Sequence, residues 1–499
     1  MRCCIKEQLE FGEVEVREIK LNPRSRDEIP KTLFGLQEIY KNIEIRNKVF
    51  SILKEMIPSN ISLTNGREGM SFWNILVLGC IRLICNADYD KLHEYANDHR
   101  KIMQMLGRSV FEIKDYPLQT IKDNVRLFTP EILNRINTLL AEFGREVMGI
   151  PVSEAIHARC DSFHIPTDIH FPTDISLLFD ALRKIIILLL NLSGDFDISG
   201  WRQGKHLLKK LKKLYRKSQK IKHSTSKDAK KKKTQRKLLR EIYKLYLDLA
   251  SSLIDRAQNN LKDLDGSDDP SLSASVLQIE KFINHAERQI DQITRRILKD
   301  EKIPHPEKVF SIFEEHTEWL CKGKAGVSQV LGLNVCIITD QYGFVLDHKV
   351  MQNETDSAIA VEIVKNAQAK FPNIKSCSFD KGFHSPINQK ELAKILENVY
   401  LPKKGKLSEV RKAIEYSEDF RYACKKHSSV EASIACLVNH GLDICPDHGI
   451  IGFKRYVGLA IVARNIHHIG CIIQQKKLRE LQKSERKRRK LLHQNKKAA

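Results

Sequence analysis

The chain has 499 residues, a hydrophobic fraction of 42% and a formal net charge of +22 at pH 7. This length exceeds what a single hydrophobic core usually serves, so we expect two or three domains. The excess of Lys and Arg favours a polyanionic partner, because cations that neutralise phosphates release counterions; a generally basic surface is the alternative. No secretory signal pattern appears and the apolar run at 185–190 is far too short to span a bilayer, so we expect a cytoplasmic protein without a membrane partner.

The first 150 residues show mainly helical patterns, after a possible hairpin at 9–19. Helices are predicted at 30–40, 43–56, 72–83, 91–106, 117–127 and 131–146. Short helices joined by tight turns are compatible with a helix-turn-helix whose recognition helix is 119–126, because Gln119, Lys122 and Arg126 offer groups to base edges and phosphates. A plain helical bundle explains the same pattern equally well.

A short alternating segment then reaches an acid. Ile156, Ala158 and Cys160 fall on one face at a period of two, as a half-buried strand requires, and Asp161 follows them. We take Asp161 as the first candidate catalytic residue, the alternative being a turn residue between edge strands. Three nearby acids compete with it, namely Asp168, Asp174 and Asp180; Asp174 can cap a helix at 177–192 and Asp180 would lie inside that helix.

A long basic excursion follows. Residues 205–244 carry a dense run of one charge sign above an apolar stripe of Leu208, Leu211 and Leu214, and a second helical pattern covers 271–298. We expect two antiparallel helices or helix pairs, inserted between the first strand and the rest of a sheet. The density of positive charge favours contact with a DNA backbone without sequence readout, through Lys209, Lys210, Lys212 and Lys213.

Strand patterns return after the excursion. The sequence predicts a hairpin of 332–339 and 344–350, a helix at 356–371, a strand at 375–380, a helix at 388–396 and a strand at 399–401. Lys324 lies among glycines before the hairpin and can approach a phosphate, but the spacing is not that of a P-loop. An apolar helix at 452–470 and a basic tail at 476–499 complete the chain, and the tail is expected to bind phosphates non-specifically.

Two further acids lie at positions where they could take part in a site, one at the end of a strand and one on a helix. Asp380 ends a strand just before Gly382, and Glu431 lies on a helix that Ser428 or Ser429 can cap, on the same face as an apolar stripe. Buried charges are costly unless paired or bound to metal, so Asp161, Asp380 and Glu431 together suggest a divalent-cation site.

Zinc is the alternative metal for this part of the chain. The twelve cysteines lack a framework spacing and fit reduced thiols, but Cys424, His427, Cys445 and His448 could form a tetrahedral zinc site. We disfavour that site because the helix that carries Glu431 separates the two pairs. Cys160 and Cys377 are more simply small buried strand residues.

The motifs around these acids resemble those of bacterial insertion-sequence transposases of the DDE class, and the best match is the ISNCY group. The resemblance is carried by Cys-Asp-Ser-Phe-His-Ile-Pro-Thr-Asp at 160–168, Asp-Lys-Gly-Phe-His-Ser-Pro at 380–386, His-Ser-Ser-Val-Glu at 427–431, and the segments 441–449 and 452–465. Segments 24–40 and 84–92 extend it over nearly the whole chain. The resemblance implies an α/β fold with a ribonuclease-H-like mixed sheet flanked by helices, an N-terminal all-α region and a helical insertion.

The resemblance also implies a domain plan. It comprises an N-terminal segment (1–60), a helix-turn-helix-like DNA-binding domain (61–150), a catalytic domain (151–200 and 325–475), a basic helical insertion (201–324) and the tail. We expect Asp161, Asp380 and Glu431 to bind two Mg²⁺ ions roughly 3.5 to 4 Å apart, with Mn²⁺ as a substitute. Lys381 would hold a phosphate as a point charge, and His164 and His384 are more simply structural.

The expected partner is double-stranded DNA, both the terminal inverted repeats of the element and the target. Cleavage at the element ends would free a 3′-hydroxyl that attacks target DNA, and each step is an in-line displacement at phosphorus. The resemblance implies a homodimer on DNA, in the cytoplasm and associated with the nucleoid. Two alternatives stay open: a catalytically inactive DNA-binding protein descended from a transposase, and a structure-specific nuclease of the same fold.

Overall fold

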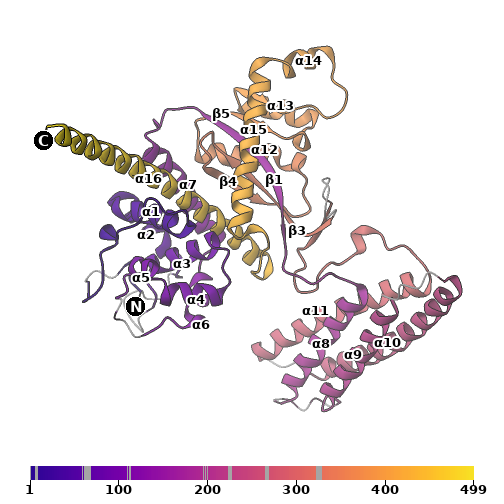
Figure 1. Cartoon of the computed structure of the whole chain (residues 1–499). Coiled ribbons are helices and arrows are strands. Elements are labelled where there is room, and N and C mark those ends of the chain that lie inside the picture. Colours follow the sequence, from indigo (N-terminus) through magenta and orange to yellow (C-terminus); the bar gives the residue numbers. More distant parts are fainter. Residues whose placement is uncertain are drawn as a thin grey trace. The chain divides into compact units, whose positions relative to one another are not determined.

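The computed structural model describes residues 2–5, 9–58, 60, 69–109, 111, 114–194, 196, 198, 200–222, 228–264, 269–321 and 329–498. Contacts divide the chain into two compact units (Figure 1). Unit 1 consists of Met1–Asp168 and Leu320–Ala499, and unit 2 is Ile169–Trp319. The second unit therefore begins earlier than the expected insertion boundary at 201, and the helix expected at 177–192 belongs to it rather than to the catalytic domain.

The N-terminal helices of unit 1 form largely where the sequence predicts them. They are α1 (Glu28–Lys41), α2 (Ile43–Lys54), α3 (Phe72–Ile84), α4 (Tyr89–Asp98), α5 (Arg100–Met105), α6 (Leu118–Val125) and α7 (Pro130–Met148). The side chains of Ser71, Asp88 and Thr129 cap α3, α4 and α7. The helix expected at 91–106 is broken into α4 and α5, because His99 adopts an extended backbone and caps α5.

The hairpin expected at 9–19 does not form. The described residues of that segment contain a short 3₁₀ turn, η1 (Val16–Glu18), and no strand. Gln37 of α1 donates hydrogen bonds to the carbonyl oxygens of Val16 and Ile19, each at 2.9 Å. The backbone groups that a hairpin would pair are thus satisfied in part by a buried side chain.

A mixed sheet lies at the centre of unit 1, and β1 (Ile156–Pro166) is in its middle. On one side β1 pairs antiparallel with β3 (Gln329–Thr339), which pairs antiparallel with β4 (Val345–Val350). On the other side β1 pairs parallel with β5 (Ile374–Phe379), which pairs parallel with β6 (Asn398–Tyr400). The short strand β2 (Glu318–Cys321) also pairs with β3. The chain is thus an α/β protein with a mixed sheet flanked by helices.

The outer edge of β4 is closed by two buried asparagines. Asn465 of the helix α16 (Gly449–Ala498) accepts from the N–H of Val345 at 3.0 Å and donates to its carbonyl oxygen at 2.9 Å. Asn137 of α7 donates to the same carbonyl at 3.0 Å, and the two asparagines bond to each other. A strand edge left open in the core would carry unpaired backbone groups, so these amides fix α7 and α16 against the sheet.

Helices cover both faces of the sheet. Ser162 of β1 bonds to Asp356, the first residue of α12 (Asp356–Lys370), while α15 (Glu418–Leu437) contacts β1, β5 and β6 and crosses the sheet in Figure 1. Between these helices lie η4 (Lys381–Phe383), α13 (Pro386–Ile395) and α14 (Glu409–Glu415). The start expected near Ser428 or Ser429 is wrong: α15 begins at Glu418 and Ser417 caps it.

Helix α16 packs against α1, α3 and α7 and joins both ends of the chain into one core. At its crossing with α1 the backbones touch, since a Cβ atom on Gly470 would overlap the carbonyl oxygen of Lys31, and one on Gly35 that of Ile466. The segment Gly449–Leu491 is long and apolar enough to cross a membrane, contrary to the expectation of no such run, but 83% of its apolar window is buried. That burial is compatible with the core helix of a soluble protein.

Unit 2 consists mainly of helices in its described part. It contains α8 (Asp174–Leu192), α9 (Gly204–Lys222), α10 (Ala229–Leu264) and α11 (Pro270–Ile293), followed by the π turn η2 (Thr294–Leu298) and the 3₁₀ turn η3 (His305–Glu307). Its own core includes the fully buried Trp201, whose indole N–H donates to Asn260 at 2.6 Å, and Leu211 of the predicted stripe. The predicted helical excursion is therefore confirmed, with an earlier start.

The crossing of α1 and α16 yields a stability prediction. Gly470→Ala should destabilise the protein by about 1–3 kcal/mol or more, because the added methyl overlaps backbone that side-chain motion cannot clear. Thermal or urea unfolding measures the change. Gly452→Ala in the same helix is the control: its Cβ would lie 3.5 Å from the nearest neighbours, so stability should hold or rise slightly. Equal melting temperatures for the Gly470 variant and the native chain would contradict the tight crossing.

Candidate active site

One face of the central strands is polar and lies under α15. Side chains alternate along a strand, so His157, Arg159 and Asp161 share a face of β1, and Ser376, Ser378 and Asp380 share the same face of β5 and its end. The bond between His157 and Ser376, 2.8 Å between Nδ1 and Oγ, joins the two rows. The opposite face carries the buried Ala158, Cys160 and Cys377, as the period of two predicts.

Strand register places Asp161 beside Asp380. The last parallel pair of β1 and β5 is Cys160 with Phe379, and the two aspartates are the next residues on adjacent strands. Asp380 follows the end of β5, as expected, but Asp161 does not end β1, which continues to Pro166 while pairing with β3. Asp161 is thus held on a continuous strand, and Asp380 stands at the start of a 3₁₀ turn where it accepts from the N–H of Lys381 at 2.7 Å.

Helix α15 brings Glu431 to the same place. His427 of this helix bonds to Ser378 of β5, 3.0 Å between Nδ1 and Oγ, and Glu431 lies one turn further along the helix. The expectation that Glu431 belongs to the apolar stripe is wrong, because its side chain is exposed while Val430 and Leu437 are the buried residues of the helix. An exposed carboxylate at the rim of the polar face can reach a bound ion or substrate from solvent.

The electrostatics of Asp161 report that these acids are neighbours. The pKa of Asp161 is raised to about 6, chiefly by burial; the negative charges of Asp380, Asp356 and Glu431 add to this rise, and the hydrogen bond from the Ser162 N–H opposes it. Among the residues that the structure describes, no ion pair is found for Asp161, and a buried carboxylate with like charges around it favours a cation.

Asp356 is a fourth acid that the sequence patterns did not single out. Its Oδ1 accepts from the Ser162 hydroxyl at 2.7 Å, and its Oδ2 would lie 3.0 Å from a Cβ placed on Gly382. It therefore stands between β1 and the turn after Asp380. An acid in the first turn of a helix is ordinary because it complements the helix dipole, so the sequence alone gave no signal of this position.

His427 carries an unsatisfied nitrogen beside the acids. Its Nε2 is buried and has no hydrogen-bond partner among the described residues, although Nδ1 is bonded to Ser378. Burial lowers the pKa of His427, and the charges of Asp380 and Glu431 oppose that effect while Arg159 adds to it. Orphaned buried polar atoms are rare and concentrate where a ligand or water completes the site.

The residues present fit a hard divalent cation. Asp161, Asp380 and Glu431 offer carboxylate oxygens, the donors that Mg²⁺ and Mn²⁺ prefer, and Asp356 lies near them although it bonds to Ser162 on the other face of β1. The acids do not close on one point: among the described residues, Glu28, His440 and His467 are the group whose ligand atoms all lie within 4.8 Å of one another.

The competing acids stand elsewhere. Asp174 and Asp180 belong to α8 of unit 2, where Asp174 pairs with Arg296 at 2.7 Å and Asp180 pairs with Arg183 at 3.4 Å. The expected capping role of Asp174 falls to Thr173. Asp168 is exposed, and its N–H donates to the carbonyl oxygen of Cys445. Asp161 is the one of these four candidates whose pKa is raised by Asp380 and Glu431.

The alternative zinc tetrad is not assembled. His427 bonds to Ser378, the thiol of Cys445 donates to the carbonyl oxygen of Asp447 at 3.8 Å, and Cys424 lies half-buried on α15. No group drawn from Cys424, His427, Cys445 and His448 brings three ligand atoms within 4.8 Å of one another in the described part of the chain. Of the two expected structural histidines, His164 bonds to Asn334 of β3, which satisfies one ring nitrogen.

The proposed recognition helix offers part of its expected surface. On α6, Gln119 and Arg126 are exposed, and Gln119 donates to Asp123 at 2.7 Å. Lys122 is half-buried, with its ammonium 5.8 Å from the ring centre of Tyr89. Asn124 is buried and bonded to Arg2 and to the carbonyl oxygen of Thr120, so it cannot read a base as the helix stands.

The remaining basic candidates are accessible where they are described. Lys209, Lys210, Lys212 and Lys213 are exposed along α9, and Lys381 is exposed next to Asp380. Among the described residues, no ion pair joins the four α9 lysines to an acid, which leaves their charge uncompensated. Lys324 lies outside the described residues.

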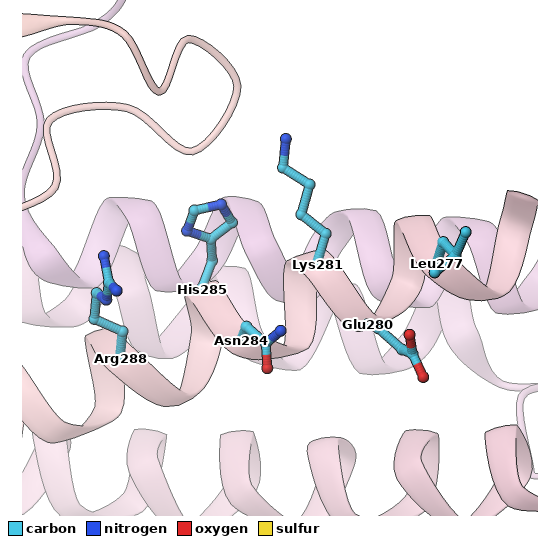
Figure 2. Close-up of a pocket in the computed structure, with 6 residues that line it drawn as sticks. All are labelled: Leu277, Glu280, Lys281, Asn284, His285 and Arg288. Carbon is cyan, nitrogen blue, oxygen red and sulfur yellow. The ribbon is translucent and has the colours of Figure 1, made fainter.

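A hollow on unit 2 carries no comparable chemistry. Figure 2 shows that its lining comes from α11 alone, with Lys281 and His285 pointing away from the helix together. Both side chains pair with Glu315, at 3.0 and 2.7 Å. The lining residues are Leu277, Glu280, Lys281, Asn284, His285 and Arg288.

A comparison of this chain with protein-family models, curated proteins and solved structures finds no match. Function is therefore inferred from the acids under α15 and from the distribution of charge.

The pKa of Asp161 predicts how stability depends on pH. Its ordinary pKa is 3.8, so between about pH 4 and about pH 6 the folded chain keeps a proton that the unfolded chain has lost. The free energy of unfolding therefore falls as the pH rises through this range, and the stabilisation by the bound proton is lost above about pH 6. Asp161→Asn should therefore raise the free energy of unfolding at about pH 8, by at most about 3 kcal/mol, and change it little at about pH 4. Urea unfolding at both pH values measures the difference.

The response of the melting temperature to Mg²⁺ provides a second test of the Asp161→Asn variant. Added Mg²⁺ should raise the melting temperature of the native chain and have a smaller effect on Asp161→Asn, because binding to the folded state alone stabilises it. Asp168→Asn is the control and should behave as the native chain does. A loss of stability in Asp161→Asn at about pH 8 would contradict an uncompensated carboxylate at this position.

Proposed function

We propose that the chain is a DDE transposase of a bacterial insertion sequence, which binds the terminal inverted repeats, cleaves DNA at the element ends and joins the freed 3′-hydroxyl to target DNA. The proposal rests on the proximity of three acids that are distant in sequence: Asp161 and Asp380 follow a pair of adjacent parallel strands, and the charges of Asp380 and Glu431 raise the pKa of Asp161. Neighbouring like charges are costly to a folded protein, so a cation-binding role is the simplest reason for their proximity.

The arrangement of strands supports the same proposal. The resemblance of the motifs to DDE transposases implies a ribonuclease-H-like layout of strand, hairpin, helix, strand, helix, strand and helix, with acids at neighbouring strands. In this chain the order β4-β3-β1 is antiparallel and β1-β5-β6 is parallel, and α15 follows with Glu431. We infer a ribonuclease-H-like domain on this basis.

The residues would divide the work among them. Asp161, Asp380 and Glu431, with Asp356 beside them, would hold Mg²⁺, which when bound supplies an activated oxygen nucleophile and neutralises charge on the leaving oxygen. Lys381 stands next to Asp380 in sequence and would attract a DNA phosphate to the site. His427 would orient a phosphate or water through its unpartnered Nε2 if that nitrogen carries the proton. The fixed strand positions of the aspartates keep these groups in place.

Backbone contact with DNA would come largely from unit 2. The exposed lysines of α9 and the exposed Lys230, Lys231, Lys232 and Lys233 of α10 present one sign of charge. Such groups contribute affinity without reading sequence. Recognition of the repeats would then fall to α6, through Gln119, Lys122 and Arg126. We propose a homodimer bridging two element ends, acting at the nucleoid.

Catalysis is tested with DNA that carries the inverted repeats flanking the gene. The native chain should nick this DNA at the repeat ends with Mg²⁺ or Mn²⁺, and Asp161→Asn, Asp380→Asn and Glu431→Gln should each lower the rate by about 100-fold or more while DNA binding persists. Asp174→Asn is the control and should cleave normally. Cleavage retained by Asp161→Asn would refute its assignment.

Joining of labelled ends to a plasmid separates the proposal from its two rivals. A transposase should give covalent joined product. Cleavage without joining would indicate a structure-specific nuclease, and binding without metal-dependent cleavage would indicate an inactive DNA-binding descendant. Either of these results would replace the proposed function.

The role of the α9 lysines is tested by the salt dependence of DNA binding. Replacing Lys209, Lys210, Lys212 and Lys213 by Gln should weaken binding to specific and random DNA alike, and should reduce the slope of log affinity against log salt by about 0.9 for each lost phosphate contact. The matched control replaces four exposed lysines of the same unit, Lys262, Lys299, Lys302 and Lys308. Equal losses in the two variants would mean that net charge alone, and not the α9 face, binds DNA.

A further inference from the structure

Three potential metal ligands from distant parts of the chain meet in unit 1, away from the acids under α15. Glu28 is the first residue of α1, His440 lies in the π turn η5 (Val438–Leu442) and His467 lies on α16. One ligand atom from each lies within 4.8 Å of the others. Both imidazole side chains are 7% exposed, and the Glu28 side chain is 41% exposed, so the cluster is buried on the histidine side and open to solvent at the carboxylate.

Without an ion, Glu28 and His467 form a hydrogen bond, and His440 lies just beyond hydrogen-bonding distance of the same carboxylate oxygen. Oε2 of Glu28 lies 2.5 Å from Nε2 of His467 and 3.9 Å from Nε2 of His440. Ligands bound tetrahedrally at Zn–N and Zn–O distances of about 2.0 to 2.1 Å stand about 3.3 Å apart, which lies between these two values. Small rotations of the three side chains reach that separation.

A thiol next to this cluster offers a fourth donor. Cys471 lies one turn after His467 on α16, and its Sγ is 3.7 Å from Nδ1 and 3.8 Å from Nε2 of His467. Its Sγ is not within 4.8 Å of all three other ligand atoms, so the Cys471 side chain would have to rotate to join them at the Zn–S distance of about 2.3 Å. A second thiol, that of Cys436 on α15, has its Sγ 3.7 Å from His440 Nδ1.

An irregular turn at the end of α15 positions His440. The end of α15 widens into the π turn, and His440 has a backbone outside the helical region, with φ −99° and ψ 46°. Gly441 follows with φ 92°, a conformation that favours glycine, and the hydroxyl of Tyr456 donates to its carbonyl oxygen at 3.0 Å. Such π turns often occur at functional sites. Here the turn points a histidine at α16.

The carboxylate is fixed by a neighbour. Lys31 donates to Oε1 of Glu28 at 2.7 Å, which leaves Oε2 to the two histidines. The close crossing at Gly35 and Gly470 sets the distance between α1 and α16, and thereby between Glu28 and His467. In metal sites, carboxylate ligands are typically held by such a hydrogen bond from an outer-shell residue.

We propose that Glu28, His440, His467 and Cys471 bind a zinc ion that joins α1, the end of α15 and α16. Imidazole and thiolate donors suit Zn²⁺ and exclude Mg²⁺ and Ca²⁺, which take oxygen. The ion would be structural, because four protein ligands leave no open position. Since His440 ends the helix that carries Glu431, the zinc would anchor that helix to the N-terminal helices.

The test is the metal content of the full-length chain, purified without a histidine tag from zinc-supplemented cells and dialysed against a weak chelator. Mass spectrometry of metals should find about one zinc per chain, and Glu28→Gln, His440→Gln and His467→Gln should each lose at least about 10-fold in zinc affinity. His468→Gln is the control: this neighbouring half-buried histidine bonds to the carbonyl oxygen of Tyr342, and its replacement should leave zinc content unchanged.

Cobalt replacement identifies the ligands independently of stability. The cobalt form should show the visible absorption of a tetrahedral site together with a thiolate-to-cobalt band, and Cys471→Ser should remove the band. Glu28 is half-exposed, so its variant should fold and can be judged even if a histidine variant does not. Zinc absent from the native chain, with melting temperatures that do not respond to zinc or chelator, would overturn the proposal and leave a Glu28–His467 hydrogen bond.

Discussion

The candidate active site depends on the parallel pairing of β1 with β5. This register ends at Cys160 and Phe379, so the next residues on the two strands are aspartates on adjacent strands roughly 4.8 Å apart. A slip of one residue would turn Asp161 to the opposite, apolar face and bury its charge without neighbours. The same pairing fixes Ser378, which bonds to His427 and so positions the helix that carries Glu431.

The N-terminal helices belong to the same core as the sheet. The expected plan separated a DNA-binding domain from a catalytic one, but Asn137 of α7 bonds to the edge strand β4 and α16 packs on α1, α3 and α7. Arg145 of α7 also forms a buried ion pair with Asp340 in the turn between β3 and β4, at 2.9 Å. The candidate recognition helix and the candidate active site therefore belong to one core of unit 1.

Much of the local structure could be predicted from the sequence. Caps such as Ser71, Asp88 and Thr129 act on the nearest backbone N–H groups, and strand alternation depends on neighbouring residues, so both leave a readable local pattern. The acids Asp161 and Asp380 could be named because each follows such a pattern. The break at His99 and the start of α15 at Ser417 were missed, since several polar residues in each segment can cap a helix.

What could not be predicted depends on contacts between distant segments. The role of Asp356 arises from Ser162, and the meeting of Glu28 with His440 and His467 arises from the crossing at two glycines. The unit boundary at Ile169 was missed because α8 has an apolar face that fits either a sheet or a helical partner; packing against α9, α10 and α11 decides between them.

The position of α16 has a consequence for synthesis of the protein. Helix α16 is synthesised after α1, α3 and α7, yet it completes their burial. Strand β1 likewise cannot pair with β3 until unit 2, which lies between them in the sequence, has been translated. Unit 2 has a core of its own and can fold as soon as its residues emerge. A nascent chain that lacks α16 would thus expose the apolar surfaces of α1, α3 and α7 until that helix has been made.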